Sequence, residues 1–181
     1  MKVIHTALPG LLLLEPQVFG DARGFFFESY NKRAFQEASG VHADFVQDNY
    51  SRSSQNVLRG LHYQIHQPQG KLVRVLHGEI YDVVVDIRRS SPTFGQWLAF
   101  ALSSESQHAA WIPAGYAHGF VVVSEFADVY YKATDYYAPR HERSLLWSDP
   151  DLAIDWPLSG APIVSDKDAR GLLLRQAETY D

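Results

Sequence analysis

The sequence predicts an all-β domain built as an antiparallel jelly-roll barrel, with a few short helices at its periphery. Short apolar stretches alternate with polar residues at a period of two, and Gly, Pro, Asn or Ser residues separate these stretches. Strands and helices do not alternate regularly along the chain, and this argues against a parallel sheet. With 181 residues, 46% hydrophobic and 20% charged, the chain is expected to form a single domain over residues 1–181.

Seven segments have the composition expected of strands. In the central one, Val83, Val85 and Ile87 alternate with charged residues, so one face of this strand is expected to be buried. The remaining candidates are residues 11–14, 25–30, 71–76, 96–102, 120–123 and 129–134.

Only residues 31–39 have the signature of a helix. Asn31 is a suitable N-cap, Ala34 and Phe35 lie on one side, and Gly40 is a typical stop signal.

The apolar residues 7–14 could be mistaken for a secretory signal. Pro9 and Gly10 interrupt them, no small-residue cleavage site follows, and no stretch approaches the roughly 18 apolar residues that cross a bilayer. The sequence therefore predicts a cytoplasmic protein without membrane association.

The charge balance and the lack of cysteine exclude several classes of function. Sixteen Lys and Arg against twenty-one Asp and Glu give a net charge of -5, which argues against general binding of nucleic acid. The absence of cysteine excludes disulfides, thiolate metal sites and cysteine nucleophiles.

Reactive side chains gather in turn-rich segments, residues 47–49, 57–64, 69–74 and 113–120. On a regular strand, His62 and Gln64 would share one face and Arg59 would lie on the opposite face. Two histidines in a barrel, His62 and His118, first suggest a metal site.

The segment 60–78 is similar to the first motif of the cupin family, whose His-x-His and Glu bind a metal together with a second-motif His. Here Gln64 and Lys71 replace the second His and the Glu, and two imidazoles beside an ammonium suit a dication poorly. We therefore expect no metal.

A base, a cation and a hydrogen-bonding histidine suit proton abstraction beside a carbonyl, with Lys71 stabilising the enolate oxygen.

Long motifs in a fixed order cover nearly the whole chain. They are Asp21-x-Arg23-Gly24-Phe25-Phe26-Phe27-Glu28, Phe45-Val46-Gln47-Asp48-Asn49, residues 56–64, 69–75, 91–97 and 111–120, Tyr131-Lys132-Ala133-Thr134-Asp135-Tyr136-Tyr137 and Ser165-Asp166-Lys167-Asp168. Together they strongly resemble the dTDP-4-dehydrorhamnose 3,5-epimerase family.

The resemblance implies a homodimeric, cofactor-free isomerase with a cupin-like jelly roll. Its substrate would be dTDP-4-dehydro-6-deoxy-D-glucose and its product dTDP-4-dehydro-L-rhamnose, on the dTDP-L-rhamnose route to cell-surface polysaccharide such as the lipopolysaccharide O-antigen.

The resemblance also implies roles for individual residues. His62 would remove the protons at C3 and C5, Asp168 would pair with His62, and Tyr131 would deliver a proton to the opposite face, with Lys71 as the cation. The implied substrate-binding residues are Arg23, Glu28, Gln47, Asp48, Asn49, Arg59, Lys71, His118, Tyr137, Glu142 and Lys167, with Tyr137 stacking on the thymine ring. In some family members the partner subunit supplies the residues corresponding to Arg23 and Glu28.

Several alternatives stay open. Strand alternation sends Tyr130 and Tyr131 to opposite faces, and a register slip of one residue would exchange them. The chain could invert only one of the two carbons, act as a metal-dependent cupin enzyme, or bind carbohydrate without catalysis. The motifs leave three points open: the order of the two inversions, the preference for dTDP and any assembly beyond a dimer.

Overall fold

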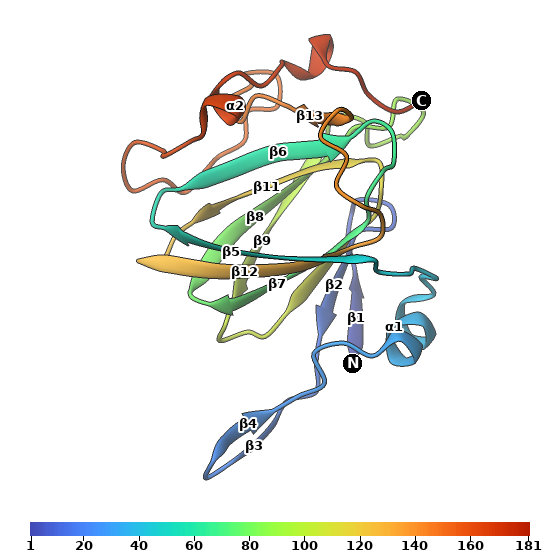
Figure 1. Ribbon diagram of the computed structural model, residues 1–181, viewed down its shortest axis with the longest axis vertical. Helices are drawn as coiled ribbons and strands as arrows, with labels where there is room; N and C mark the ends of the chain where they lie inside the picture. Colours follow the sequence, from blue (N-terminus) through green and yellow to red (C-terminus); the bar gives the residue numbers. More distant parts are fainter.

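The computed structural model describes all residues, 1–181, and shows two antiparallel sheets that face each other (Figure 1). The first sheet has six strands, in spatial order β1 (Lys2–His5), β2 (Leu12–Glu15), β10 (Ala109–Ile112), β7 (Lys71–His77), β12 (Phe126–Ala133) and β5 (Gln47–Ser54). The second sheet has five, in spatial order β13 (Glu142–Ser144), β6 (Leu58–Gln64), β11 (Tyr116–Val122), β8 (Glu79–Asp86) and β9 (Trp97–Ser103). The predicted antiparallel jelly-roll architecture is confirmed.

A separate hairpin of β3 (Phe19–Asp21) and β4 (Gly24–Phe26) projects away from the two sheets (Figure 1). The predicted strand over residues 25–30 is therefore wrong beyond Phe26. The sequence analysis also missed β5, because the strand is mostly polar and lacks the alternation of apolar residues that identifies a half-buried strand.

The helices are short and peripheral. They are α1 (Lys32–Ser39), α2 (Asp166–Ala169) and a 3-10 turn, η1 (Leu174–Gln176). Both ends of α1 have the predicted caps. At its start the Asn31 side chain accepts a hydrogen bond from the Ala34 N–H, and at its end Gly40 adopts a left-handed conformation with φ of 71°. No helix has the length and apolar character needed to span a membrane.

Two apolar cores lie on the two sides of the five-stranded sheet. One fills part of the space between the sheets and includes Val73 and Val84. The other lies between the outer face of this sheet and the C-terminal segment, where Val83 and Val85 pack with Trp156. The expectation that β8 has one buried face is therefore incomplete, because the C-terminal segment covers the face that the sheet would otherwise expose.

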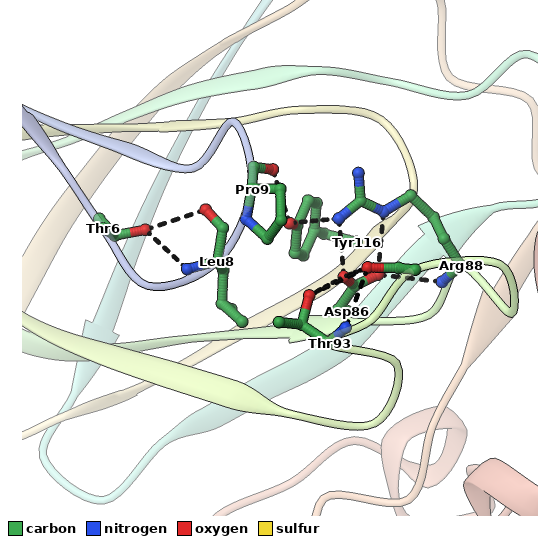
Figure 2. Close-up of polar contacts among 8 residues, drawn as sticks. Thr6, Leu8, Pro9, Asp86, Arg88, Thr93 and Tyr116 are labelled. Atoms are coloured by element: carbon green, nitrogen blue, oxygen red, sulfur yellow. Dashed lines mark hydrogen bonds and ion pairs between the residues drawn. The ribbon is translucent and has the colours of Figure 1, made fainter.

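The two aspartates of β8, Asp82 and Asp86, share the face of Val84 between the sheets, and Asp86 shows how one of them is accommodated (Figure 2). Its carboxylate is fully buried and accepts hydrogen bonds from Arg88, Ser91 and Thr93 at 2.6–3.0 Å. Burial acts to raise the pKa of Asp86, but these hydrogen bonds outweigh it and lower the pKa to about 2.

The Asp86 network also ties the N-terminal turn to the barrel. Arg88 donates to the Tyr116 hydroxyl at 2.5 Å, and that hydroxyl donates to the Pro9 carbonyl at 2.8 Å, as Figure 2 shows. The turn between β1 and β2 is thereby fixed to the ends of β8 and β11.

Candidate active site

A cavity of about 310 Å³ lies between the two sheets, and polar side chains dominate its wall. This volume is at the lower end of the range that accommodates small ligands. The lining residues are Asn49, Tyr50, Ser51, Arg59, His62, Lys71, His118, Gly119, Phe120, Tyr131, Tyr137, Glu142 and Lys167. Nine of the sequence-predicted site residues are among these thirteen: Asn49, Arg59, His62, Lys71, His118, Tyr131, Tyr137, Glu142 and Lys167.

An irregularity in β6 brings Arg59 and His62 to the same cavity. His118 of β11 pairs with His62, and Phe120 pairs with Arg59, so β6 has one residue more than β11 over this interval. Such a bulge reverses the alternation of side chains along one strand. The expectation that Arg59 faces away from His62 is wrong for this reason. Arg59 Nε donates to Ser53 Oγ at 2.9 Å.

His62 is backed by a buried carboxylate from the C-terminal segment. Its Nε2 lies 2.6 Å from Asp168 Oδ1, and Asp168 is 3% exposed. The N–H of Gly60, in the irregular part of β6, donates to the other oxygen at 3.3 Å, and Ser165 caps α2 by accepting from the Asp168 N–H at 3.1 Å.

The environment of Asp168 fixes its charge and the tautomer of His62. Burial acts to raise the pKa of Asp168, but the hydrogen bond and the charge of His62 outweigh it, so the pKa is lowered. Because an ionised carboxylate only accepts, Nε2 of the neutral ring carries the proton and Nδ1 is left as the basic nitrogen.

Tyr131 lines the cavity and Tyr130 does not. Tyr130 instead accepts a hydrogen bond from Lys132 at 3.2 Å on the other face of β12, where Lys132 also binds Asp48 at 2.8 Å. Burial raises the pKa of Tyr131, so its hydroxyl keeps its proton at neutral pH. This side chain can therefore act as an acid.

Lys71 contributes an ammonium to the cavity wall without any hydrogen-bond partner in the chain. Burial lowers the pKa of Lys71 to about 8, against the opposing attraction of Glu142 and Asp82. The group is therefore mostly charged at neutral pH and is available to a negatively charged oxygen of a ligand.

Glu142 links two other residues of the wall. It accepts hydrogen bonds from Lys167 and from the hydroxyl of Tyr137, both at 2.8 Å. Burial acts to raise the pKa of Glu142, but these two hydrogen bonds outweigh it and the pKa is lowered. The three side chains form a connected polar edge of the cavity.

Glutamine side chains hold the loop that carries Tyr137. Gln64 accepts from the Ala138 N–H at 2.8 Å and donates to the Tyr136 carbonyl at 3.2 Å, while Gln47 accepts from the Tyr137 N–H at 2.8 Å. Gln64 stands where the cupin pattern has a metal-binding histidine, and here its amide is used on the backbone. No group of three or more His, Asp or Glu side chains is arranged to hold a metal ion.

Five predicted site residues lie outside the cavity wall, and one of them is Asp168, which backs His62. Gln47 supports the Tyr137 loop, and Asp48 binds Lys132 on the outer face of the sheet. Arg23 binds Asp21 at 3.1 Å on the projecting hairpin, and Glu28 accepts from Asn31 at 2.9 Å beside α1.

The cavity also contains a feature that the sequence analysis missed. His118 Nε2 lies 2.7 Å from Oδ1 of Asp82, which is fully buried on β8. The alternation of Asp82 with the valines of β8 places it on one face of that strand, but only knowledge of what faces that side could have identified it as part of a site.

Comparison with known proteins agrees with this geometry. Residues 5–176 match the family model described as dTDP-4-dehydrorhamnose 3,5-epimerase. The chain is 59% identical over 180 residues to a dTDP-4-dehydrorhamnose 3,5-epimerase of Pseudomonas aeruginosa, covering 99% of each protein. It is 57% identical over 178 residues to one of Salmonella typhimurium, covering 98% of this chain and 97% of the relative.

Among solved structures, the epimerase RmlC from Legionella pneumophila, in complex with dTDP-4-keto-L-rhamnose, matches with a TM-score of 0.95 and 52% identity. The match covers 98% of this chain and 94% of that one. The chain therefore belongs to the dTDP-4-dehydrorhamnose 3,5-epimerase family.

Proposed function

We propose that this chain is an isomerase that converts dTDP-4-dehydro-6-deoxy-D-glucose into dTDP-4-dehydro-L-rhamnose by inverting C3 and C5. The observation that carries the proposal is the pairing of His62 with buried Asp168 in a cavity that also holds the protonated phenol of Tyr131. A base and an acid in one enclosed space are what an inversion at carbon requires.

The first step is removal of a proton next to the C4 ketone. Nδ1 of His62 takes the proton from C3 or C5, and the electron pair moves to the ketone oxygen to give an enolate. Asp168 stabilises the imidazolium that forms, and the Lys71 ammonium stabilises the enolate oxygen. A preorganised donor of this kind contributes about 3 kcal/mol to transition-state stabilisation.

The second step returns a proton to the opposite face of the sugar. Tyr131 donates its hydroxyl proton to the carbon, the enolate electrons return to form the ketone, and His62 loses its proton to solvent while the phenolate regains one. Because the proton leaves on one face and arrives on the other, the configuration is inverted.

The nucleotide part is bound by the remaining wall of the cavity. Tyr137, whose exposed ring is held by Glu142, stacks on the thymine, and Arg59 and Lys167 supply positive charge for the pyrophosphate. Local cations of this kind explain how a chain with a net charge of -5 can bind an anionic ligand.

We propose further that two subunits share each site. Arg23 lies on the hairpin that projects from the barrel, and Phe25 and Phe26 of the same hairpin are 63% and 71% exposed. Large exposed phenyl groups are typical of surfaces that bind a partner. In a homodimer the hairpin would carry Arg23 to the cavity of the other subunit, and the neighbouring Glu28 would follow.

Incubation with substrate in D₂O tests the reaction. We expect deuterium at both C3 and C5 and formation of the L-sugar, and we expect H62A to abolish both exchange and product. Exchange by H62A at the wild-type rate would remove His62 as the base. Label confined to one carbon would indicate a single-carbon epimerase, and loss of activity with a stoichiometric metal on chelation would indicate a metal-dependent enzyme.

A further inference from the structure

Two aspartates of β8 are fully buried between the sheets, but their surroundings differ. Both oxygens of Asp86 accept hydrogen bonds, as Figure 2 shows. Asp82 accepts one hydrogen bond, from His118, and its Oδ2 is buried without any partner. A buried carboxylate oxygen without a partner lowers stability, and such groups are rare enough to need a reason. Asp86 has the environment of a structural residue, and Asp82 does not.

The only hydrogen bond of the Asp82 side chain joins it to His118, a residue of the cavity wall. His118 lies on β11 directly beside His62 of β6, and its side chain is almost fully buried. Because the Asp82 carboxylate only accepts, Nε2 of the neutral His118 ring carries the proton. Nδ1 of His118 has no partner in the chain and is not among the fully buried unpaired atoms. It is therefore left to a ligand in the cavity that His118 lines.

We propose that Asp82 is a positioning residue: by holding Nε2–H of His118, it presents Nδ1 as a hydrogen-bond acceptor to a hydroxyl group of the sugar. A sugar held at this point cannot rotate freely within the cavity, so its ketone stays within reach of Lys71 and its acidic carbons stay in reach of His62. The inference rests on the proposed function for the identity of the ligand, but the state of the His118 ring does not depend on it.

The buried charge of Asp82 acts on Lys71 as well. Asp82 is one of two carboxylates, with Glu142, whose attraction opposes the effect of burial on the pKa of Lys71. A negative charge without a full set of hydrogen bonds is less screened than that of Asp86 and acts more strongly on neighbouring groups. The incompletely hydrogen-bonded Asp82 carboxylate thus acts on two residues that would contact the substrate: it holds the His118 ring, and its charge acts on Lys71.

The test compares D82N with the matched variant D86N on the same strand. The asparagine amide can donate to His118 Nε2, which favours the other tautomer and turns Nδ1 from an acceptor into a donor. We expect D82N to lower kcat about 10- to 100-fold, since the lost interaction involves a charged group, with an unchanged or higher Tm. We expect D86N to lower Tm and to leave kcat per folded molecule at the wild-type value.

Nitrogen-15 NMR of the histidine rings gives a second readout that needs no turnover. Wild-type protein should show His118 as the Nε2–H tautomer, and D82N should populate the Nδ1–H tautomer. Unchanged ring signals in D82N would overturn the proposal even if the chain had no epimerase activity. Equal losses of kcat in D82N and D86N, in step with Tm, would also overturn it, because both residues would then be structural.

Discussion

Lys71 is the side chain whose ordinary acid–base behaviour is most changed by its place in the cavity. Its pKa is lowered to about 8 by burial, so the charged form is lost as the pH rises through that value. We expect kcat to fall above about pH 8, because a neutral amine stabilises the enolate poorly. The pH dependence of kcat measures this directly.

The matched variant is K71R, whose guanidinium stays charged at every accessible pH. We expect K71R to be slower than the wild type near neutrality, because its geometry differs, but to lack the decline at alkaline pH. The same alkaline decline in K71R would assign it to another group.

Tyr131 and Tyr130 form a natural pair for testing the second proton transfer. We expect Y131F to exchange substrate protons with D₂O, because His62 is intact, but to form product about 10² to 10⁴ times more slowly. A proton returned by His62 arrives on the face that it left, so exchange without inversion is the expected signature. NMR of the sugar separates the two events.

Y130F is the control, since Tyr130 lies outside the cavity and binds Lys132. It should retain both exchange and inversion. Inversion by Y131F at the wild-type rate, or its loss in Y130F, would mean that the acid has been assigned to the wrong residue.

At the scale of single elements, β6 shows what the sequence could and could not predict. Residues 58–64 are not among the segments with the composition of strands, although the structure places Leu61 and Tyr63 of β6 in the apolar core on its outer face. Alternation failed for Arg59, because the extra residue in β6 depends on how β11 packs beside it. Similarly, α2 brings Asp168 to His62 only because the C-terminal segment packs over the sheet, a contact between residues 106 positions apart.

The loop after β12 depends on Gln64 in a way that can be measured. Replacing Gln64 by Leu removes the acceptor for the Ala138 N–H and the donor to the Tyr136 carbonyl. We expect the Tyr137 ring to lose its fixed position and KM to rise about tenfold, with a smaller change in kcat, because stacking acts equally on ground state and transition state. Steady-state kinetics and calorimetric titration with dTDP would report this.

Gln55 offers a matched control, since its exposed amide donates only to the Val123 carbonyl at 2.9 Å. Q55L should leave KM unchanged. A Q64L enzyme with normal KM and normal dTDP affinity would show that the loop holds its position without the glutamine.

For the whole molecule, the two apolar cores on either side of the five-stranded sheet explain where the cavity lies. Apolar side chains such as Val73 and Val84 fill one part of the space between the sheets, and polar side chains from β5, β6, β7 and β12 surround the other part. The second core anchors the C-terminal segment and thereby α2 with Asp168. The hairpin with Arg23 belongs to neither core, so it is free to reach a second subunit.

If the hairpin of one subunit completes the cavity of the other, two defective variants should repair each other. An H62A subunit has a normal hairpin, and an R23A subunit has a normal cavity. In a mixed dimer, one site therefore combines both defects and the other site is complete. We expect an equal mixture, unfolded and refolded together, to reach about a quarter of the wild-type activity, because about half of the dimers are mixed and each holds one intact site. If the hairpin instead served its own subunit, every site in the mixture would retain one defect, and activity would not exceed the mean of the two variants measured separately.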